Sequence, residues 1–500
     1  MRLHLEGNIN TYYVQTLCMI FFPGSKFSKE AQEEEGAPAL SLRLEEDTDA
    51  CTAYAEMSAD GKKELAVQRF AFTKDMTKER TRKLAAGGAV MKAGERLLGY
   101  RPSWGMMTGV RPSKLAMELL LKGKSAEETR QTLAKEFFAI PKKAALATEV
   151  ALRERKMLEN HTAKDCSLYV SIPFCPTRCA YCSFVSYTSQ RLLSLIPEYL
   201  NALVEDVSQI LEQIRTLGLH LKTIYIGGGT PTILEPDQLR LLLSTIAAHC
   251  DVASLEEYTL ESGRPDTITA EKFKVAKEYG VERVSVNPQT LCDEVLHRIG
   301  RSHTTEQFLR AYHIARESGI SCINTDLIAG LPGDTFGTFA RSFDKIMELR
   351  PENVTVHTFC VKKAADILRQ NEEVYSRQGG DAGKCVDYTQ IRTAMAGYVP
   401  YYMYRQKNTV GNFENVGFSL PGYEGRYNVY MMEEFHSVFA AGAGAVTKAV
   451  EYTPDGSRAP QIARFFDHKY PFEYLRDREN QMKAKLDFIA DYYQKRGLLD

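Results

Sequence analysis

The sequence predicts an α/β protein built around a partial (β/α)6 barrel, with a separate N-terminal α+β module and a C-terminal lid region. Two observations lead to this fold class. Between residues 168 and 359, six short apolar segments alternate with longer stretches of helical periodicity, which is the pattern of parallel βαβ units. Directly after the first apolar segment come three closely spaced cysteines, at the position where such a barrel carries its chemistry.

The chain length predicts more than one domain, and the charge balance excludes some classes of partner. With 500 residues the chain exceeds what one hydrophobic core usually holds, so we expect two or three domains. The formal net charge of −1 argues against a nucleic acid partner, because phosphate binding needs a basic surplus on some face. No apolar run reaches the length of a membrane span.

The cysteine usage and the first residues predict a cytoplasmic protein. Eleven cysteines in a chain of this length are too sparse and too uneven for a disulfide framework, and they fit a reducing compartment where thiolates stay free to bind metal. The segment from Met1 to Phe22 contains Glu6 and lacks a small-residue cleavage site, so it makes a poor signal peptide.

The part of the chain before the barrel reads as two pieces. We expect a mixed module over residues 1–125 and a helical linker over 126–165, with helices near Ser125–Phe138 and Lys142–Asn160. The turn-rich segment Gly99–Pro112 holds Trp104, the one tryptophan of the chain. A binding loop is one interpretation of this segment, but a packed domain junction is the favoured one.

The barrel is expected over residues 166–360, and the remainder, 361–500, as a region that covers it and contacts the substrate. The predicted strands are Leu168–Ile172, Thr223–Ile226, Tyr258–Glu261, Arg283–Asn287, Cys322–Ile328 and Val354–Phe359. The predicted helices between them are Arg191–Leu217, Gln238–Ala248, Ala270–Tyr279, Thr305–Ser318 and Thr335–Leu349. After Phe359 the rhythm breaks, and we expect a strand at Tyr401–Arg405, helices at Met431–Phe435 and Phe472–Gly497, and a lid or third layer over the barrel mouth.

The strongest chemical signal is the loop that carries Cys175, Cys179 and Cys182. Zinc sites close with four ligands, whereas three thiolates in one loop can bind three corners of a cubane iron–sulfur cluster and leave one iron open for chemistry. Cys179-x2-Cys182 alone would also fit half a zinc site or a redox dithiol. Cys166 is a hypothetical fourth ligand, but a strand between it and the loop would carry it away.

Further polar and glycine motifs follow the later strands. Gly227-Gly228-Gly229-Thr230 comes directly after the second strand, where it predicts either a tight strand-to-helix turn or a backbone that a ligand approaches closely. Glu261, Gln289 and Asp326 stand at strand ends, where burial without partners would be costly. A zwitterionic, ribose-bearing cofactor would supply those partners, with an arginine such as Arg301 for its carboxylate.

These motifs together resemble the radical S-adenosylmethionine (SAM) enzymes. Tyr169-Val170-Ser171-Ile172-Pro173-Phe174-Cys175, Val286–Thr290 with Arg301, and Asp326–Gly333 are similar to the oxygen-independent coproporphyrinogen III oxidase-like family. The region Asn412–Gly417 and the long N-terminus look most like its HemZ (coproporphyrinogen dehydrogenase) subgroup.

The resemblance implies a set of roles. Cys175, Cys179 and Cys182 would ligate a [4Fe-4S] cluster whose fourth iron takes the amino and carboxylate groups of S-adenosyl-L-methionine. Cofactor contacts would come from a larger set of residues: Tyr169, Tyr181, Gly228, Gly229, Thr230, Glu261, Gln289, Arg301 and Asp326. The implied reaction is oxidative decarboxylation of two propionates of coproporphyrinogen III to the vinyl groups of protoporphyrinogen IX by a 5′-deoxyadenosyl radical, in haem biosynthesis.

The resemblance also implies partners, namely a tetrapyrrole substrate and a low-potential electron donor such as flavodoxin or ferredoxin. Substrate carboxylates need cations, for which Arg264, Arg405 and Lys407 are the candidates. Two departures concern the substrate. Phe184 replaces a further cysteine of the oxidases, and Ser171 replaces a histidine, which brings the loop closer to the related haem chaperones. The alternatives are therefore a cluster-containing chaperone without oxidase activity and a radical SAM enzyme acting on another substrate.

Overall fold

The computed structural model describes residues 1–27, 36–74, 76–109, 111–182, 184–360, 380–406, 409–451 and 461–497. The chain divides into two compact units. The first comprises 1–152, 371–383 and 403–414, and the second comprises 153–370, 384–402 and 415–500. No helix within the described ranges is long and apolar enough to cross a membrane.

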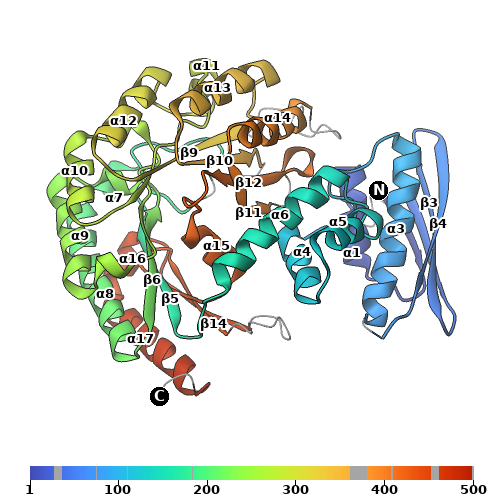
Figure 1. The fold of residues 1–500 in the computed structure, drawn as a ribbon, viewed down its shortest axis with the longest axis horizontal. Helices are drawn as coiled ribbons and strands as arrows, with labels where there is room; N and C mark the ends of the chain where they lie inside the picture. Colours follow the sequence, from blue (N-terminus) through green and yellow to red (C-terminus); the bar gives the residue numbers. More distant parts are fainter. Residues whose placement is uncertain are drawn as a thin grey trace. The chain divides into compact units, whose positions relative to one another are not determined.

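The first unit contains a four-stranded sheet in the order β1-β2-β3-β4, in which β1 pairs with β2 in parallel and the other pairs are antiparallel. Its strands are β1 (Arg2–Glu6), β2 (Ala39–Glu46), β3 (Ala50–Ala59) and β4 (Lys62–Ala71). Helices α1 (Thr11–Phe21) and α3 (Lys78–Leu98) share its hydrophobic core, and α3 lies along β3 and β4 (Figure 1). The expected N-terminal α+β module is confirmed.

The helices that precede the barrel form where the sequence predicts them. After α4 (Pro112–Leu121), α5 (Ala126–Lys135) begins with a capping box in which Ser125 and Glu128 exchange hydrogen bonds. The next helix, α6 (Pro141–Leu158), begins at a proline, which suits a first helical turn. Trp104 is fully buried and its Nε1 donates to Glu414 Oε2 at 2.8 Å, so it packs inside the first unit.

The second unit is built on one open sheet in the order β11-β12-β10-β9-β8-β7-β6-β5-β13-β14-β15. Its middle consists of six parallel strands in sequence order, which confirms the partial barrel. They are β5 (Asp165–Ile172), β6 (His220–Gly228), β7 (Glu257–Leu260), β8 (Arg283–Ser285), β9 (Cys322–Ala329) and β10 (Asn353–Thr358).

Amphipathic helices cover the outer face of this sheet (Figure 1). They are α8 (Ile196–Thr216), α9 (Pro236–His249), α10 (Ala270–Glu278), α11 (Asp293–Arg298), α12 (Thr305–Glu317) and α13 (Phe336–Leu349), and the single-turn helix α7 (Gln190–Leu193), which precedes α8, has no buried residue. Capping boxes at Glu235, Thr304 and Thr335 fix where α9, α12 and α13 begin. Because each apolar strand is followed by a helix with one apolar stripe, the chain returns over the same face every time.

The described strands of the C-terminal region extend the sheet and do not form the expected lid or third layer. Next to β10 lie β12 (Glu414–Ser419), which is antiparallel to it, and β11 (Val399–Arg405). Next to β5 lie β13 (Ser437–Ala441), then β14 (Val446–Glu451) and β15 (Gln461–Phe466). The open barrel offers unpaired N–H and C=O groups at both edges, and these strands satisfy them.

The helices of the C-terminal region are α14 (Asp381–Met395), α15 (Arg426–Glu433), α16 (Pro471–Arg476) and α17 (Arg478–Gln494). The helix expected at Met431–Phe435 begins five residues earlier and ends before Glu434, which adopts a left-handed conformation at φ 57°. Helix α15 lies on the inner side of the sheet, opposite the ring of outer helices (Figure 1).

Candidate functional site

The cysteine loop leaves the barrel at the C-terminal end of β5, which ends at Ile172. Cys175 is buried, and its Sγ lies 3.3 Å from Thr230 Oγ1 at the end of β6. The Cys182 N–H donates to Cys179 O at 3.1 Å, and the Ala180 N–H donates to Ile299 O at 3.0 Å. The loop is therefore held by its own turn, by the neighbouring strand and by the end of α11.

All eleven cysteines are free thiols, so the three in the loop are available as ligands. Burial raises the pKa of the Cys175 and Cys182 thiols, and the charge of neighbouring cysteine thiolates raises both pKa values further. The protein alone thus disfavours three thiolates here, and a cationic metal centre would stabilise them. Cys166 lies inside β5, six residues before the strand ends, at a distance of about 20 Å along the strand, so it is not a fourth ligand.

The ligand set fits a cluster better than a single ion. Among the described residues, no three His, Cys, Asp or Glu side chains are grouped so as to hold one metal ion. A cubane cluster needs no such grouping, because each thiolate binds a different iron. Gly229 leaves room beside the loop, since a Cβ there would lie 2.6 Å from Phe174 O and 3.0 Å from Cys175 Sγ.

The glycine motif after β6 serves the turn. Gly228 has φ +113°, and a Cβ on it would lie 2.9 Å from Ile172 O. The N–H groups of Gly229 and Thr230 donate to Ile172 O and Phe174 O, both at 2.8 Å. These two N–H groups are engaged within the chain, which fits the interpretation of the motif as a tight turn. The motif instead brings Thr230 and the cysteine loop into contact.

The strand-end polar residues gather in the barrel interior. Glu261 follows β7, where burial and the charge of Asp326 raise its pKa to about 7, although a hydrogen bond from Tyr225 partly offsets them. Asp326 on β9 accepts hydrogen bonds from Asn287 Nδ2 at 2.9 Å and Asn324 Nδ2 at 2.7 Å. The site therefore holds two nearby carboxyl groups. Because the pKa of Glu261 is raised, a cationic partner would favour the ionised form of its carboxyl.

Two further predicted residues present polar atoms that the chain leaves unsatisfied. Gln289 has a left-handed backbone, at φ 69°, and its N–H donates to Asp326 O. Arg301 Nη2 donates to Asn287 O at 3.0 Å. Among the described residues, Gln289 Oε1 and Arg301 Nε are buried without a hydrogen-bond partner. A bound ligand would supply the hydrogen-bond partners that these two buried atoms lack.

Three tyrosines stack inside the barrel next to Glu261. The Tyr169 ring lies 6.2 Å from that of Tyr225 and 6.4 Å from that of Tyr427, and Tyr225 and Tyr427 are 4.6 Å apart. Burial raises the pKa of all three hydroxyls. Tyr225 was missed in the sequence, although it pairs in register with Tyr169 and β alternation could have revealed it. Tyr427 comes from α15 and had no sequence signal.

Tyr181, the other aromatic residue expected beside the cofactor, lies within the cysteine loop. Burial raises the pKa of its hydroxyl, and the nearby charge of Arg301 lowers it. Arg301, which follows α11, therefore lies close to the cysteine loop.

The three cations expected to bind substrate carboxylates lie elsewhere or are already engaged. Arg264 is buried against the cysteine loop, where it pairs with Asp266 at 2.8 Å and donates to Thr177 Oγ1 at 2.8 Å. Arg405 belongs to the first unit, where it is buried and donates to the carbonyls of Met107 and Gly109. Lys407 lies outside the described residues. For both arginines the substrate role is corrected, because the chain itself supplies their acceptors.

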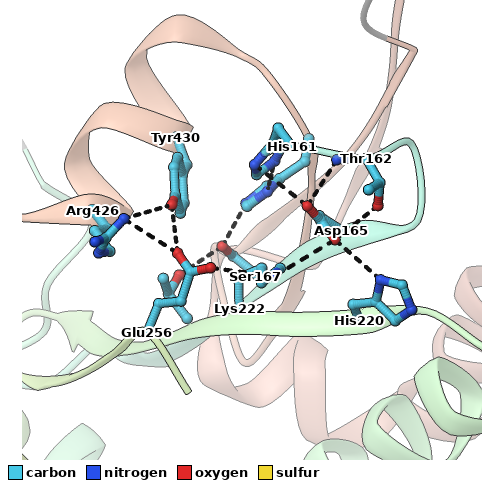
Figure 2. Close-up of polar contacts among 11 residues, drawn as sticks. His161, Thr162, Asp165, Ser167, His220, Lys222, Glu256, Arg426 and Tyr430 are labelled. Carbon is cyan, nitrogen blue, oxygen red and sulfur yellow. Dashed lines mark hydrogen bonds and ion pairs between the residues drawn. The ribbon is translucent and has the colours of Figure 1, made fainter. Parts of the chain in front are cut away.

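The opposite end of the barrel strands carries a buried polar network (Figure 2). His161 faces Asp165 at 3.4 Å and His436 at 2.5 Å, and His436 Nε2 lies 2.7 Å from Ser167 Oγ. Because the Asp165 carboxylate can only accept hydrogen bonds, the groups that face it, His161 among them, must act as donors toward it. Lys222 pairs with Glu256, which also accepts from Tyr430 on α15. This network anchors α15 under the barrel, well separated along the strands from the cysteine loop.

Residues 169–346 match the Radical SAM superfamily model, and this range contains the second half of β5 and all of β6, β7, β8 and β9. Membership of this class implies a [4Fe-4S] cluster and SAM, and the site described above has the donors for both.

The chain is 34% identical to the oxygen-independent coproporphyrinogen-III oxidase-like protein HemZ of Bacillus subtilis (strain 168), over 99% of this chain and 97% of that protein. It is 31% identical to the haem chaperone HemW of Lactococcus lactis subsp. lactis, over 58% of this chain and 72% of that protein. The fold matches coproporphyrinogen III oxidase (HemN) from Escherichia coli with TM-score 0.50 and 21% identity, over 66% and 73% of the two chains. The chain therefore belongs to the oxygen-independent coproporphyrinogen III oxidase-like family of radical SAM proteins.

Proposed function

We propose that this protein catalyses the oxygen-independent oxidative decarboxylation of coproporphyrinogen III propionates to vinyl groups. The observation that carries the proposal is the likeness to HemZ, a protein named oxidase-like, which extends over 99% of the chain. The likeness to the HemW chaperones covers between 41% and 66% of it. The N-terminal module and the α15 region are thus part of what this chain shares with HemZ.

In this proposal Cys175, Cys179 and Cys182 bind the cluster, and the barrel interior binds SAM. When bound, the two groups supply a one-electron route to hydrogen-atom abstraction from an unactivated carbon. Glu261 would accept a hydrogen bond from the amino group of SAM, and the cationic cofactor would favour the ionised form of its carboxyl. Arg301 Nε and Gln289 Oε1 would pair with the carboxylate and a ribose hydroxyl, which satisfies both orphan atoms.

The stacked tyrosines and the buried strand ends would keep water out of the reaction. The Tyr427 side chain is buried, and its ring stacks against those of Tyr169 and Tyr225. Helix α15, which carries it, therefore covers the interior of the barrel. A dry interior prevents a reactive carbon centre from being quenched by side reactions. Tyr169, at the edge of this group, would face the cofactor.

A second function, a cluster-containing haem chaperone, is favoured by one specific observation. Phe184 takes the place of the further cysteine of the oxidases, and its side chain is 70% exposed, so it does not replace that cysteine in any buried role. The chaperone would bind haem without converting coproporphyrinogen.

The test is anaerobic reconstitution with iron and sulfide, reduction, and addition of SAM with coproporphyrinogen III. The proposal expects equal accumulation of 5′-deoxyadenosine and of vinyl groups, measured by liquid chromatography and mass spectrometry. Deoxyadenosine without any vinyl product would refute the decarboxylation and leave another substrate. Stable stoichiometric haem binding with no turnover would establish the chaperone instead. Cys179→Ala is the control that should lose cluster absorption and both products.

A further inference from the structure

Exposed aromatic side chains gather on two segments beside the cysteine loop. We name four of them the aromatic patch: Phe184, Tyr187, Tyr470 and Phe472. The rings of Tyr187 and Tyr470 lie 5.6 Å apart, and Tyr187 Oη donates to Lys469 O at 2.9 Å, which holds the two segments together. Phe184 is 70% exposed, Tyr470 56% and Phe472 41%. Clustered exposed aromatic residues of this kind mark interaction sites.

The patch adjoins the cysteine loop directly. The Cys175 N–H donates to Tyr187 O at 3.0 Å, and the Tyr187 N–H donates to Pro173 O at 2.8 Å. Phe184 follows Cys182 by two residues, so their Cα atoms are at most about 7 Å apart. Any protein seated on the patch would therefore lie within a few ångströms of the backbone that holds the cluster.

The patch and the proposed cofactor site lie on opposite sides of strand β5. Val185 packs at the end of β13, since a Cβ on Gly444 would lie 3.3 Å from Val185 Cγ1. Thr230, which touches Cys175 from the cofactor side, follows β6. Because β5 separates β13 from β6 in the sheet, a molecule on the patch faces the cluster and not the SAM contacts. A substrate must reach the cofactor, whereas an electron donor needs only the cluster.

The segment of the patch that follows the cysteine loop is positively charged, although the whole chain has a net charge of −1. Residues 176–191 contain Arg178 and Arg191 and no acidic residue. Arg191 lies over the Phe472 ring at 5.2 Å, and Lys469 is exposed next to Tyr470. Glu473 is the carboxylate recorded near Tyr187. An acidic partner would be steered to this surface.

We infer that the aromatic patch, with Arg178, Arg191 and Lys469 around it, is the docking surface for an acidic, low-potential electron-transfer protein of the flavodoxin type. On docking, the reduced flavin of the donor loses one electron and the cluster gains it, and no bond forms between the proteins. The inference rests on the proposed function only in requiring a reducible cluster, because uncoupled SAM cleavage reports electron delivery without any porphyrinogen.

The experiment compares two reductants on reconstituted full-length protein. Phe184→Ser, Tyr470→Ser and the double variant Arg191→Glu/Lys469→Glu are each assayed for 5′-deoxyadenosine formation, driven either by flavodoxin with its NADPH-dependent reductase or by dithionite. The matched controls are Met395→Ser, an apolar side chain 73% exposed on α14, and Lys274→Glu, an exposed charge on α10. Direct binding of oxidised flavodoxin is measured by biolayer interferometry.

We expect each patch variant to raise the flavodoxin concentration for half-maximal rate, and the Kd, by about tenfold or more, with the dithionite rate unchanged. The charge reversal should also flatten the dependence on ionic strength. Unchanged flavodoxin kinetics would overturn the inference. A parallel fall in the dithionite rate would overturn it as well, since the patch would then be structural. A dithionite-driven KM increase confined to coproporphyrinogen would assign the patch to the substrate instead.

Discussion

Replacing Glu261 by Gln tests the electrostatics of the proposed SAM site. The carboxyl is fully buried, and its pKa stands at about 7 instead of 4.5 because of burial and the charge of Asp326. Keeping it ionised at pH 8 therefore costs on the order of 3 kcal/mol. The stability linked to this carboxyl is complete below pH 4.5 and is lost as the pH rises through about 7. The neutral amide of Glu261→Gln should escape that loss.

The assay is the melting temperature of reconstituted protein between pH 5 and 8, with and without SAM. Without SAM, the variant should match the parent at pH 5 and melt about 5 °C higher at pH 8. With SAM, the advantage of the variant should shrink, because the amide gives the amino group of SAM no charged acceptor and a tenfold loss of SAM affinity removes about 1.4 kcal/mol of ligand stabilisation. The exposed Glu271→Gln is the control. Equal melting at pH 8 would refute the claim that burial dominates Glu261.

Three further changes test other parts of the molecule. Gly229→Ala should prevent cluster incorporation, since its Cβ would lie 2.6 Å from Phe174 O; normal visible absorption after reconstitution would contradict this. Burial lowers the pKa of His161 and His436, so their contribution to stability is present above about pH 6.5 and lost as the pH falls below it. His436→Gln should therefore show a smaller drop in melting temperature from pH 7 to pH 5 than the parent protein. An unchanged drop would mean that other groups cause the acid sensitivity. Trp104→Phe removes the Nε1–H that donates to Glu414 Oε2 at 2.8 Å and should cost about 2 kcal/mol in urea unfolding; a loss below 0.5 kcal/mol would contradict that hydrogen bond's role.

The barrel could be predicted because its strands and helices carry unambiguous periodicity. Each of the six predicted strands lies within three residues of its observed start, since buried parallel strands are short apolar runs bounded by turn residues. The C-terminal region could not be predicted in the same way. Its strands form by completing two open sheet edges, and edge pairing depends on which neighbour is free and not on the local sequence.

The residues of the candidate site also differ in how far they could be predicted from the sequence. Glu261 and Gln289 were predictable because the C-terminal ends of parallel strands meet at one rim, so residues distant in sequence converge. Asp326 was expected at a strand end but lies within β9, three residues before the strand ends. The pairing of Arg264 with Asp266 was not, because it depends on a turn whose geometry no periodicity specifies. Tyr427 reaches the interior through α15, and no motif in the sequence linked this short helix to the inner face of the sheet.

The residues on the two sides of the cysteine loop differ in how closely they are packed. On the side of β6, Gly229 and Thr230 fit so closely against Cys175 that no larger residue could replace the glycine without moving the loop. On the side of β13, Phe184 is largely exposed, and nothing in its surroundings requires an aromatic residue there. An exposed phenylalanine without a partner in the chain costs solubility and contributes no folding energy. The close packing on the β6 side therefore fits the proposed cofactor chemistry. On the β13 side, a docked partner protein would explain why Phe184 stands where the oxidases have a cysteine.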